Sequence, residues 1–105
     1  MAQFAVYKNK NPRTKSTFPL LVDVQSDLLE SLNTRVVVPL TKAAGFTKKP
    51  VSHLTPSVNF DGEAYLLMTP QLAGIPRSEL GAEVGALAEN HHAILAAVDF
   101  LLTGF

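Results

Sequence analysis

Alternating apolar and polar residues predict several short strands in the N-terminal part of the chain. The alternation is present at 3–7, and a second strand is predicted at 20–24, where β-branched residues occur and the alternation begins at Val22. The β-branched run at 35–40 indicates a third strand. Its end, at Pro39, should lie at an edge or a bend, because proline has no backbone N–H. The polar and basic stretch 8–17, which contains Asn-Pro, predicts a mobile loop between the first two strands.

The clearest local signal is an Asp-Gly pair between two apolar runs. Asp61-Gly62 separates the alternating segment 57–60 from the apolar run 64–68. Glycine accepts the positive φ that a two-residue hairpin turn requires, so this pattern predicts a β-hairpin. Another short apolar piece follows at 72–76, and the stretch 41–56 is mostly loop in character.

The C-terminal part has the spacing of an amphipathic helix from about Glu89 to Leu102. Only Asp99 is polar within 93–102, so the predicted helix is apolar on nearly all sides. A chain of 105 residues cannot bury both sides of its last helix, so we expect part of the helix or the tail to contact another chain. The alternative is an unremarkable exposed face formed by three alanines: Ala93, Ala96 and Ala97.

Several strands followed by one helix predict an α+β fold, with a mostly antiparallel curved sheet or small barrel and the helix at one end. The preceding stretch 78–88 carries two glycines and is not assigned to a helix. The length fits a single domain over residues 1–105. The positions expected in the barrel core or packed beneath it are Val22, Val24, Val36, Val38, Val58, Phe60, Ile94, Leu95 and Val98.

Composition excludes several classes of protein. An apolar content of 47% with zero net charge excludes whole-chain disorder, and no apolar run is long enough to span a bilayer. There is no cysteine and no visible signal peptide, which together favour a cytoplasmic protein. Residues 1–49 carry eight basic and three acidic side chains, whereas residues 50–105 carry one and six. Neutrality argues against direct nucleic-acid binding, but the basic half could attract an acidic partner.

No arrangement of residues indicates catalysis. His91 and His92 are adjacent on the predicted helix and project about 100° apart, and His53 lies in a proline-rich loop without an obvious partner. Asp23 and Asp27 are separated by a strand-to-turn boundary and are interpreted as turn and cap residues. The glycine-rich phosphate-binding motifs and the nucleophile-elbow motif are absent. These observations favour a binding protein over an enzyme, with no cofactor and no metal.

The segment Val22-Asp23-Val24-Gln25-Ser26-Asp27 resembles the VDVQSD segment of the CcdB toxins. These proteins are the toxic halves of bacterial toxin–antitoxin pairs and poison DNA gyrase. The resemblance continues in order and spacing along nearly the whole chain, through Val38-Pro39-Leu40 and Met68-Thr69 to Gly104. It implies an SH3-like barrel of antiparallel strands with a C-terminal α-helix, a symmetric homodimer, and no catalysis by the toxin itself.

The resemblance also implies where gyrase would bind. The GyrA subunit, held on cleaved DNA, would contact an apolar pair and the end of the helix: Leu28, Leu29, Asp99, Leu102, Thr103, Gly104 and Phe105. The best-known members carry other residues at three of these positions. They have Asn in place of Asp99, Phe in place of Leu102 and Trp in place of Thr103.

The second implied partner is a CcdA-like antitoxin, whose C-terminal segment is typically disordered and acidic and folds on the toxin. Charge favours the basic loop as its landing site, through Lys8, Lys10, Arg13 and Lys15. No membrane partner is expected.

Two alternatives remain open from the sequence. The same barrel is used by endoribonuclease toxins, which need a base and cations around a phosphate. The available candidates for that role are Arg35, Arg77 and the three histidines. The other alternative is a non-toxic homologue that only binds antitoxin.

Overall fold

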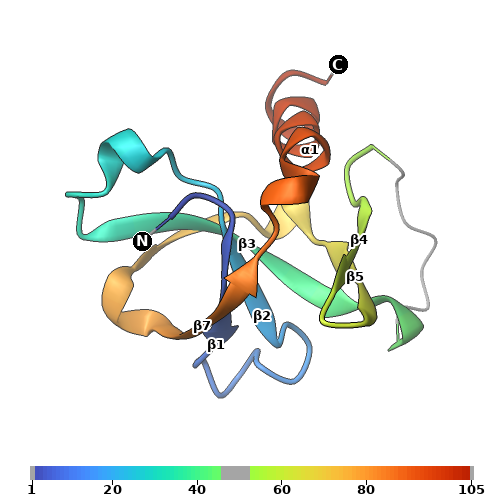
Figure 1. The fold of residues 1–105 in the computed structure, drawn as a ribbon, viewed down its shortest axis with the longest axis horizontal. Coiled ribbons are helices and arrows are strands. Elements are labelled where there is room, and N and C mark those ends of the chain that lie inside the picture. Colours follow the sequence, from blue (N-terminus) through green and yellow to red (C-terminus); the bar gives the residue numbers. More distant parts are fainter. Residues whose placement is uncertain (1, 46–52, 105) are drawn as a thin grey trace.

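The strands form one curled sheet in the computed structural model, which describes residues 2–45 and 53–104 (Figure 1). The sheet order is β4-β5-β3-β2-β1-β7, and β6 pairs with β3 off this path. All the pairings are antiparallel. The strands are β1 (Ala5–Asn9), β2 (Leu20–Asp23), β3 (Thr34–Lys42), β4 (Ser57–Phe60), β5 (Glu63–Leu67), β6 (Ala73–Pro76) and β7 (Leu80–Ala86).

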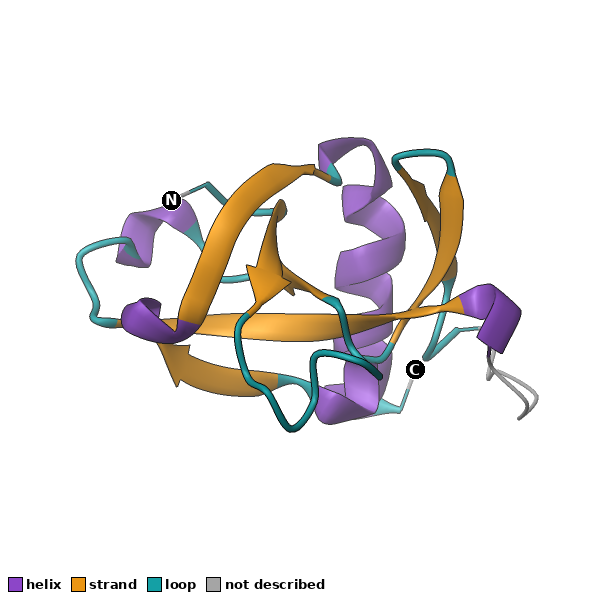
Figure 2. Ribbon diagram, turned by 90° about the horizontal axis from the view of Figure 1, so that it is seen from below, coloured by secondary structure: helices purple, strands orange, loops and turns teal. Residues whose placement is uncertain are grey.

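One α-helix, α1 (His91–Thr103), follows the last strand. Short 3-10 turns connect the other elements: η1 (Asp27–Leu29), η2 (Ala43–Gly45), η3 (Thr69–Gln71), η4 (Arg77–Glu79) and η5 (Ala88–Asn90). Figure 2, seen from below, shows α1 across the middle of the curled sheet, between the N-terminal end and the β4–β5 hairpin. In the described parts of the chain, no helix has the length and apolar character needed to cross a membrane.

The predicted α+β class is confirmed, with the barrel present as a curled half-barrel that carries the C-terminal helix. The two outer strands come together through an aromatic ring. A Cβ atom placed on Gly85 of β7 would lie 2.7 Å from a ring carbon of Phe60 in β4. Glycine is therefore required at position 85 for the two edges to approach this closely.

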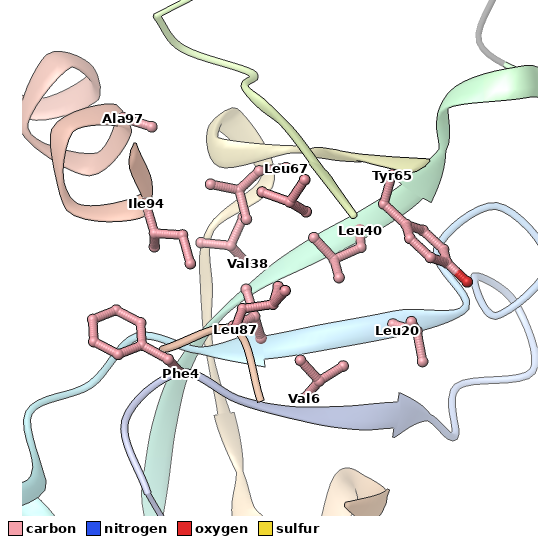
Figure 3. Packing of buried hydrophobic residues seen from close by; sticks show 12 residues of the cluster. Phe4, Val6, Leu20, Val38, Leu40, Tyr65, Leu67, Leu87, Ile94 and Ala97 are labelled. Carbon is pink, nitrogen blue, oxygen red and sulfur yellow. The ribbon is translucent and has the colours of Figure 1, made fainter. Parts of the chain in front are cut away.

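Strand alternation places apolar side chains on both faces of the sheet. One face packs against α1 through Phe4, Val6, Leu20, Val22, Val38, Leu40, Val58, Tyr65, Leu67, Leu87, Ile94 and Ala97. In Figure 3, Ile94 points from the helix toward Val38 and Leu67. The opposite face carries a second cluster of Ala5, Tyr7, Leu21, Val37 and Leu80.

The core prediction is confirmed at four positions and needs correction elsewhere. Val22, Val38, Val58 and Ile94 are buried. Leu95 is 40% exposed, because it projects about 100° away from Ile94 on the helix. The remaining predicted core residues are only partly buried: Val24, Val36, Phe60 and Val98.

Ala97 is fully buried in place of Leu95, since it lies one turn beyond Ile94 on the face that meets the sheet. The alternative of an exposed alanine face is therefore wrong at Ala97. Ala93 and Ala96 are exposed. The helix begins at His91, after the 3-10 turn η5, and ends one residue beyond the predicted boundary.

The hairpin prediction is confirmed. Asp61 and Gly62 both have positive φ, 52° and 80°, as a type I′ turn requires. By contrast, the residue pattern at 78–88 predicts no strand, yet β7 lies there. Its glycines serve close packing, because a Cβ on Gly81 would lie 2.6 Å from the Lys8 carbonyl oxygen of β1.

Pro39 lies inside β3 and not at its end. Its carbonyl accepts a hydrogen bond from the Met68 N–H at 2.9 Å. In a strand, the N–H and C=O of one residue point the same way, so the missing N–H of Pro39 also faces that side. On this side, β6 pairs with β3 from Thr34 to Val37, and β5 pairs with β3 from Leu40 to Lys42. The proline therefore falls at a local gap in the ladder.

Candidate partner-binding surfaces

The end of α1 projects from the sheet and presents the predicted tail residues (Figure 1). Asp99, Leu102, Thr103 and Gly104 are all exposed, and Leu102 is 73% exposed. Gly104 ends the helix in the left-handed conformation, with φ 79°, and its N–H donates to the Phe100 carbonyl at 2.8 Å. The Thr103 hydroxyl donates to the Asp99 carbonyl at 2.7 Å. Phe105 lies outside the described residues.

The apolar pair after VDVQSD lies in the 3-10 turn η1. Ser26 caps this turn, because its hydroxyl accepts the Leu28 N–H at 3.2 Å. Leu28 is 93% exposed and Leu29 is 48% exposed. Leu32, 47% exposed, belongs to the same patch but was missed from the sequence. The signal available was its position three residues after Leu29, which continues a one-sided apolar pattern.

These two parts of the predicted gyrase surface do not meet within one chain. Figures 1 and 2 place η1 near the N-terminus at one end of the sheet, away from the end of α1. The helix keeps exposed apolar side chains as expected: Leu95 and Leu102 lie on one side at 40% and 73% exposure, and Leu101, at 37%, lies about a third of a turn away.

The prediction that His53 has no obvious partner is wrong. Its ring stacks on Phe100, with the ring centroids 6.1 Å apart and the planes at 29°. This contact leaves Phe100 partly buried.

The basic residues predicted for the antitoxin surround the end of β1. Lys8 belongs to β1, whereas Lys10, Arg13 and Lys15 lie in the loop that leads to β2. All four side chains are exposed. The loop is shaped by an asparagine, since the Asn9 side-chain amide donates to the Thr14 hydroxyl and to the Phe18 carbonyl, each at 2.9 Å.

A groove of about 540 Å³ lies beside this loop. Its apolar lining comes from the outer faces of β2, β3 and β6 and includes Leu21, Val37 and Ile75. Lys10 and Glu79 also line it. The sequence did not reveal this groove, because residues far apart along the chain form it only once the sheet is assembled.

Asp23 and Arg35 form a buried ion pair. The guanidinium Nε lies 2.7 Å from an Asp23 carboxylate oxygen, and both side chains are fully buried. The other Asp23 oxygen accepts the Gln25 N–H at 3.0 Å. Interpreting Asp23 as a turn residue alone is thus incomplete. Asp27 does serve the turn, since it begins η1 and accepts the Gln3 N–H at 2.7 Å.

The remaining titratable candidates are dispersed. His91 contacts the Ala88 carbonyl at 2.8 Å and packs near the Phe4 ring. The His91 and His92 rings lie 4.1 Å apart between centroids. Among residues 2–45 and 53–104, no group of three or more His, Asp or Glu side chains could hold a metal ion.

The structure combines a curled antiparallel sheet with exposed leucines at η1 and at the helix end. A family model described as CcdB protein matches residues 3–104. The chain therefore belongs to the CcdB family, whose members are gyrase-poisoning toxins of toxin–antitoxin systems. The match covers the VDVQSD segment, the basic loop and all the tail positions except Phe105.

Proposed function

We propose that this protein is a type II toxin that binds the GyrA subunit and traps gyrase on cleaved DNA, with a CcdA-like antitoxin as its neutralising partner. The main support is that six of the seven residues implied as gyrase contacts, all except Phe105, which lies outside the described residues, are exposed at η1 and at the end of α1. Leucines this exposed gain free energy when a partner covers them, at about 1.5–3 kcal/mol for full burial.

The toxin needs no chemistry of its own in this account. It stabilises the cleaved state because it binds that state more tightly than the others, while gyrase cuts the DNA. The endoribonuclease alternative is weakened, because one of its candidate cations, Arg35, is fully buried against Asp23 and could not contact a phosphate. Arg77 is also engaged, through hydrogen bonds from its side chain to the Glu30 carbonyl and from its backbone N–H to the Asn33 carbonyl.

Purified gyrase with supercoiled plasmid tests the function directly. We expect the protein to accumulate linear, gyrase-linked DNA and to leave an RNA substrate intact. Induction should arrest wild-type cells but not cells with a resistant gyrase. RNA cleavage without trapped gyrase would establish the ribonuclease alternative, and growth without arrest would establish the non-toxic homologue.

A homodimer is the proposed assembly. A second copy of the chain would cover Leu95 and Leu101 of α1, and a two-fold dimer would also present two copies of each gyrase-binding surface. Light scattering at micromolar concentration should give about twice the chain mass of 11.3 kDa. A monomer at that concentration would contradict the proposed assembly.

The basic loop and the groove beside it are the proposed antitoxin site. An acidic segment that folds on the toxin could place carboxylates near Lys8, Lys10, Arg13 and Lys15 and apolar side chains in the groove. Reversing these four charges should lower antitoxin affinity strongly at low salt. The matched variant Glu79→Gln, which removes a negative charge beside the same groove, should raise affinity slightly. Equal affinities for all three proteins would contradict this site.

A further inference from the structure

The turn that carries Leu28 and Leu29 has no buried side chain of its own. Every residue from 27 to 34 is exposed. Burial of apolar area, which fixes most of the fold, therefore does not fix this segment. Its shape depends on hydrogen bonds made by the parts of the chain around it.

Gln25 connects this segment to the sheet. Its side-chain amide donates to the Leu29 carbonyl at 3.1 Å, while its amide oxygen accepts the Val36 N–H of β3 at 2.9 Å. Gln25 is itself 7% exposed, and its backbone is held by the Asp23 carboxylate. One buried side chain thus joins the turn to the middle of the sheet.

Arg77 holds the part of the same segment that follows Leu29. Its guanidinium donates to the Glu30 carbonyl and its backbone N–H donates to the Asn33 carbonyl at 3.0 Å. Arg77 stands at the start of η4, which follows β6. The segment is therefore tied to β3 through Gln25 at Leu29 and to η4 through Arg77 at Glu30 and Asn33, immediately at and after the exposed leucines.

We propose that Gln25 and Arg77 are positioning residues for gyrase binding, which hold η1 so that Leu28 and Leu29 are presented in a fixed arrangement. This inference rests on the proposed function. Neither residue needs to touch gyrase. Their contribution is to remove the conformational freedom that the segment would otherwise lose on binding.

Two measurements test this role: the affinity for purified GyrA, and the hydrogen-exchange rates of backbone amides in the free toxin. Gln25→Met and Arg77→Ala each remove one side-chain hydrogen bond to the segment and should each weaken GyrA binding about fivefold to tenfold. Gln25→Met also removes the bond from the Val36 N–H. The amides of Leu29, Glu30 and Leu32 should exchange faster by a similar factor, with those of the β4–β5 hairpin unchanged. Arg77→Lys keeps a donor and should restore most of the affinity.

Val58→Ala is the matched control, because it destabilises the opposite end of the sheet and leaves η1 intact. It should retain GyrA affinity even though its melting temperature falls. Arg77→Ala keeps the test decisive if Gln25→Met fails to fold, since Arg77 is only partly buried.

Wild-type exchange and affinity in both Gln25→Met and Arg77→Ala would overturn the positioning role. If the double variant Leu28→Ala/Leu29→Ala nevertheless loses affinity, the proposed function survives that result. If the double leucine variant also binds as the wild type does, η1 is not a gyrase-binding surface, and the positioning role is wrong as well. DNA trapping by the unmodified toxin still tests the proposed function separately.

Discussion

The η1 segment connects two strands of the sheet and the β4–β5 hairpin forms one edge of it, and different forces hold them. The hairpin inserts Val58, Tyr65 and Leu67 into the core and closes with a type I′ turn. The η1 segment inserts no side chain and is held by polar groups around it. Its support rests on the buried Asp23–Arg35 pair.

This difference explains how a small protein can expose leucines on a segment whose backbone conformation is still fixed. An apolar anchor would have to be buried to fix the segment, and a buried leucine could not contact a partner. A polar network fixes the backbone and leaves Leu28 and Leu29 free for binding. We therefore expect mutations in the two regions to separate stability from function.

The largest expected effect is on the support beneath η1. Arg35→Ala leaves the Asp23 carboxylate buried and unpaired and should cost about 3–5 kcal/mol of unfolding free energy. Urea unfolding measures this loss. The double variant Asp23→Leu/Arg35→Met removes both charges and should be clearly more stable than Arg35→Ala. A single variant as stable as the wild type would contradict the role assigned to the pair.

The hairpin should respond to loss of apolar volume and not to loss of charge. Val58→Ala creates a small cavity beside Leu67 and should cost about 1–3 kcal/mol. Thermal unfolding should show the loss, while DNA trapping per folded molecule stays unchanged. Reduced trapping by the fully folded variant would mean that the hairpin belongs to the gyrase surface.

The sequence predicted the hairpin because all its determinants are local. Asp61-Gly62 and the flanking alternation lie within a dozen residues. The η1 support could not be predicted, because Gln25 meets Val36 and Arg77 meets Glu30 only after the strands assemble. The strand β7 was missed for a related reason. Gly81 and Gly85 weaken its local pattern but are required where β7 packs closely against Lys8 and Phe60.

Substitution of the exposed leucines should reduce DNA trapping and leave stability nearly unchanged, the opposite of the result expected for the hairpin. Leu28→Ser should change the free energy of unfolding by less than about 0.5 kcal/mol, because Leu28 is 93% exposed. DNA trapping should nevertheless fall about tenfold or more, as for loss of an interface anchor. Titrating toxin into the gyrase assay measures the change. Full trapping by Leu28→Ser would remove Leu28 from the contact surface.

The smallest expected effect is on how the free energy of unfolding depends on pH in the alkaline range. Burial, and then the negative charges of Glu83 and Asp23, raise the pKa of the Tyr7 phenol above its ordinary value near 10. Above that pH the unfolded chain loses the proton that the folded chain keeps, so stability falls as pH rises toward the folded-state pKa. Tyr7→Phe should lack this slope in urea unfolding between about pH 9 and pH 11. The same slope in Tyr7→Phe would assign it to other groups.

The most direct test of the account compares gyrase trapping by the full chain with trapping by a chain that ends at Leu102. The truncation removes Thr103, Gly104 and Phe105, and none of the described residues it removes is buried. Circular dichroism and light scattering should show the folded assembly retained. The account predicts that the shortened chain forms almost no gyrase-linked linear DNA. Trapping equal to that of the full chain would contradict the assignment of the helix end as the gyrase-binding surface.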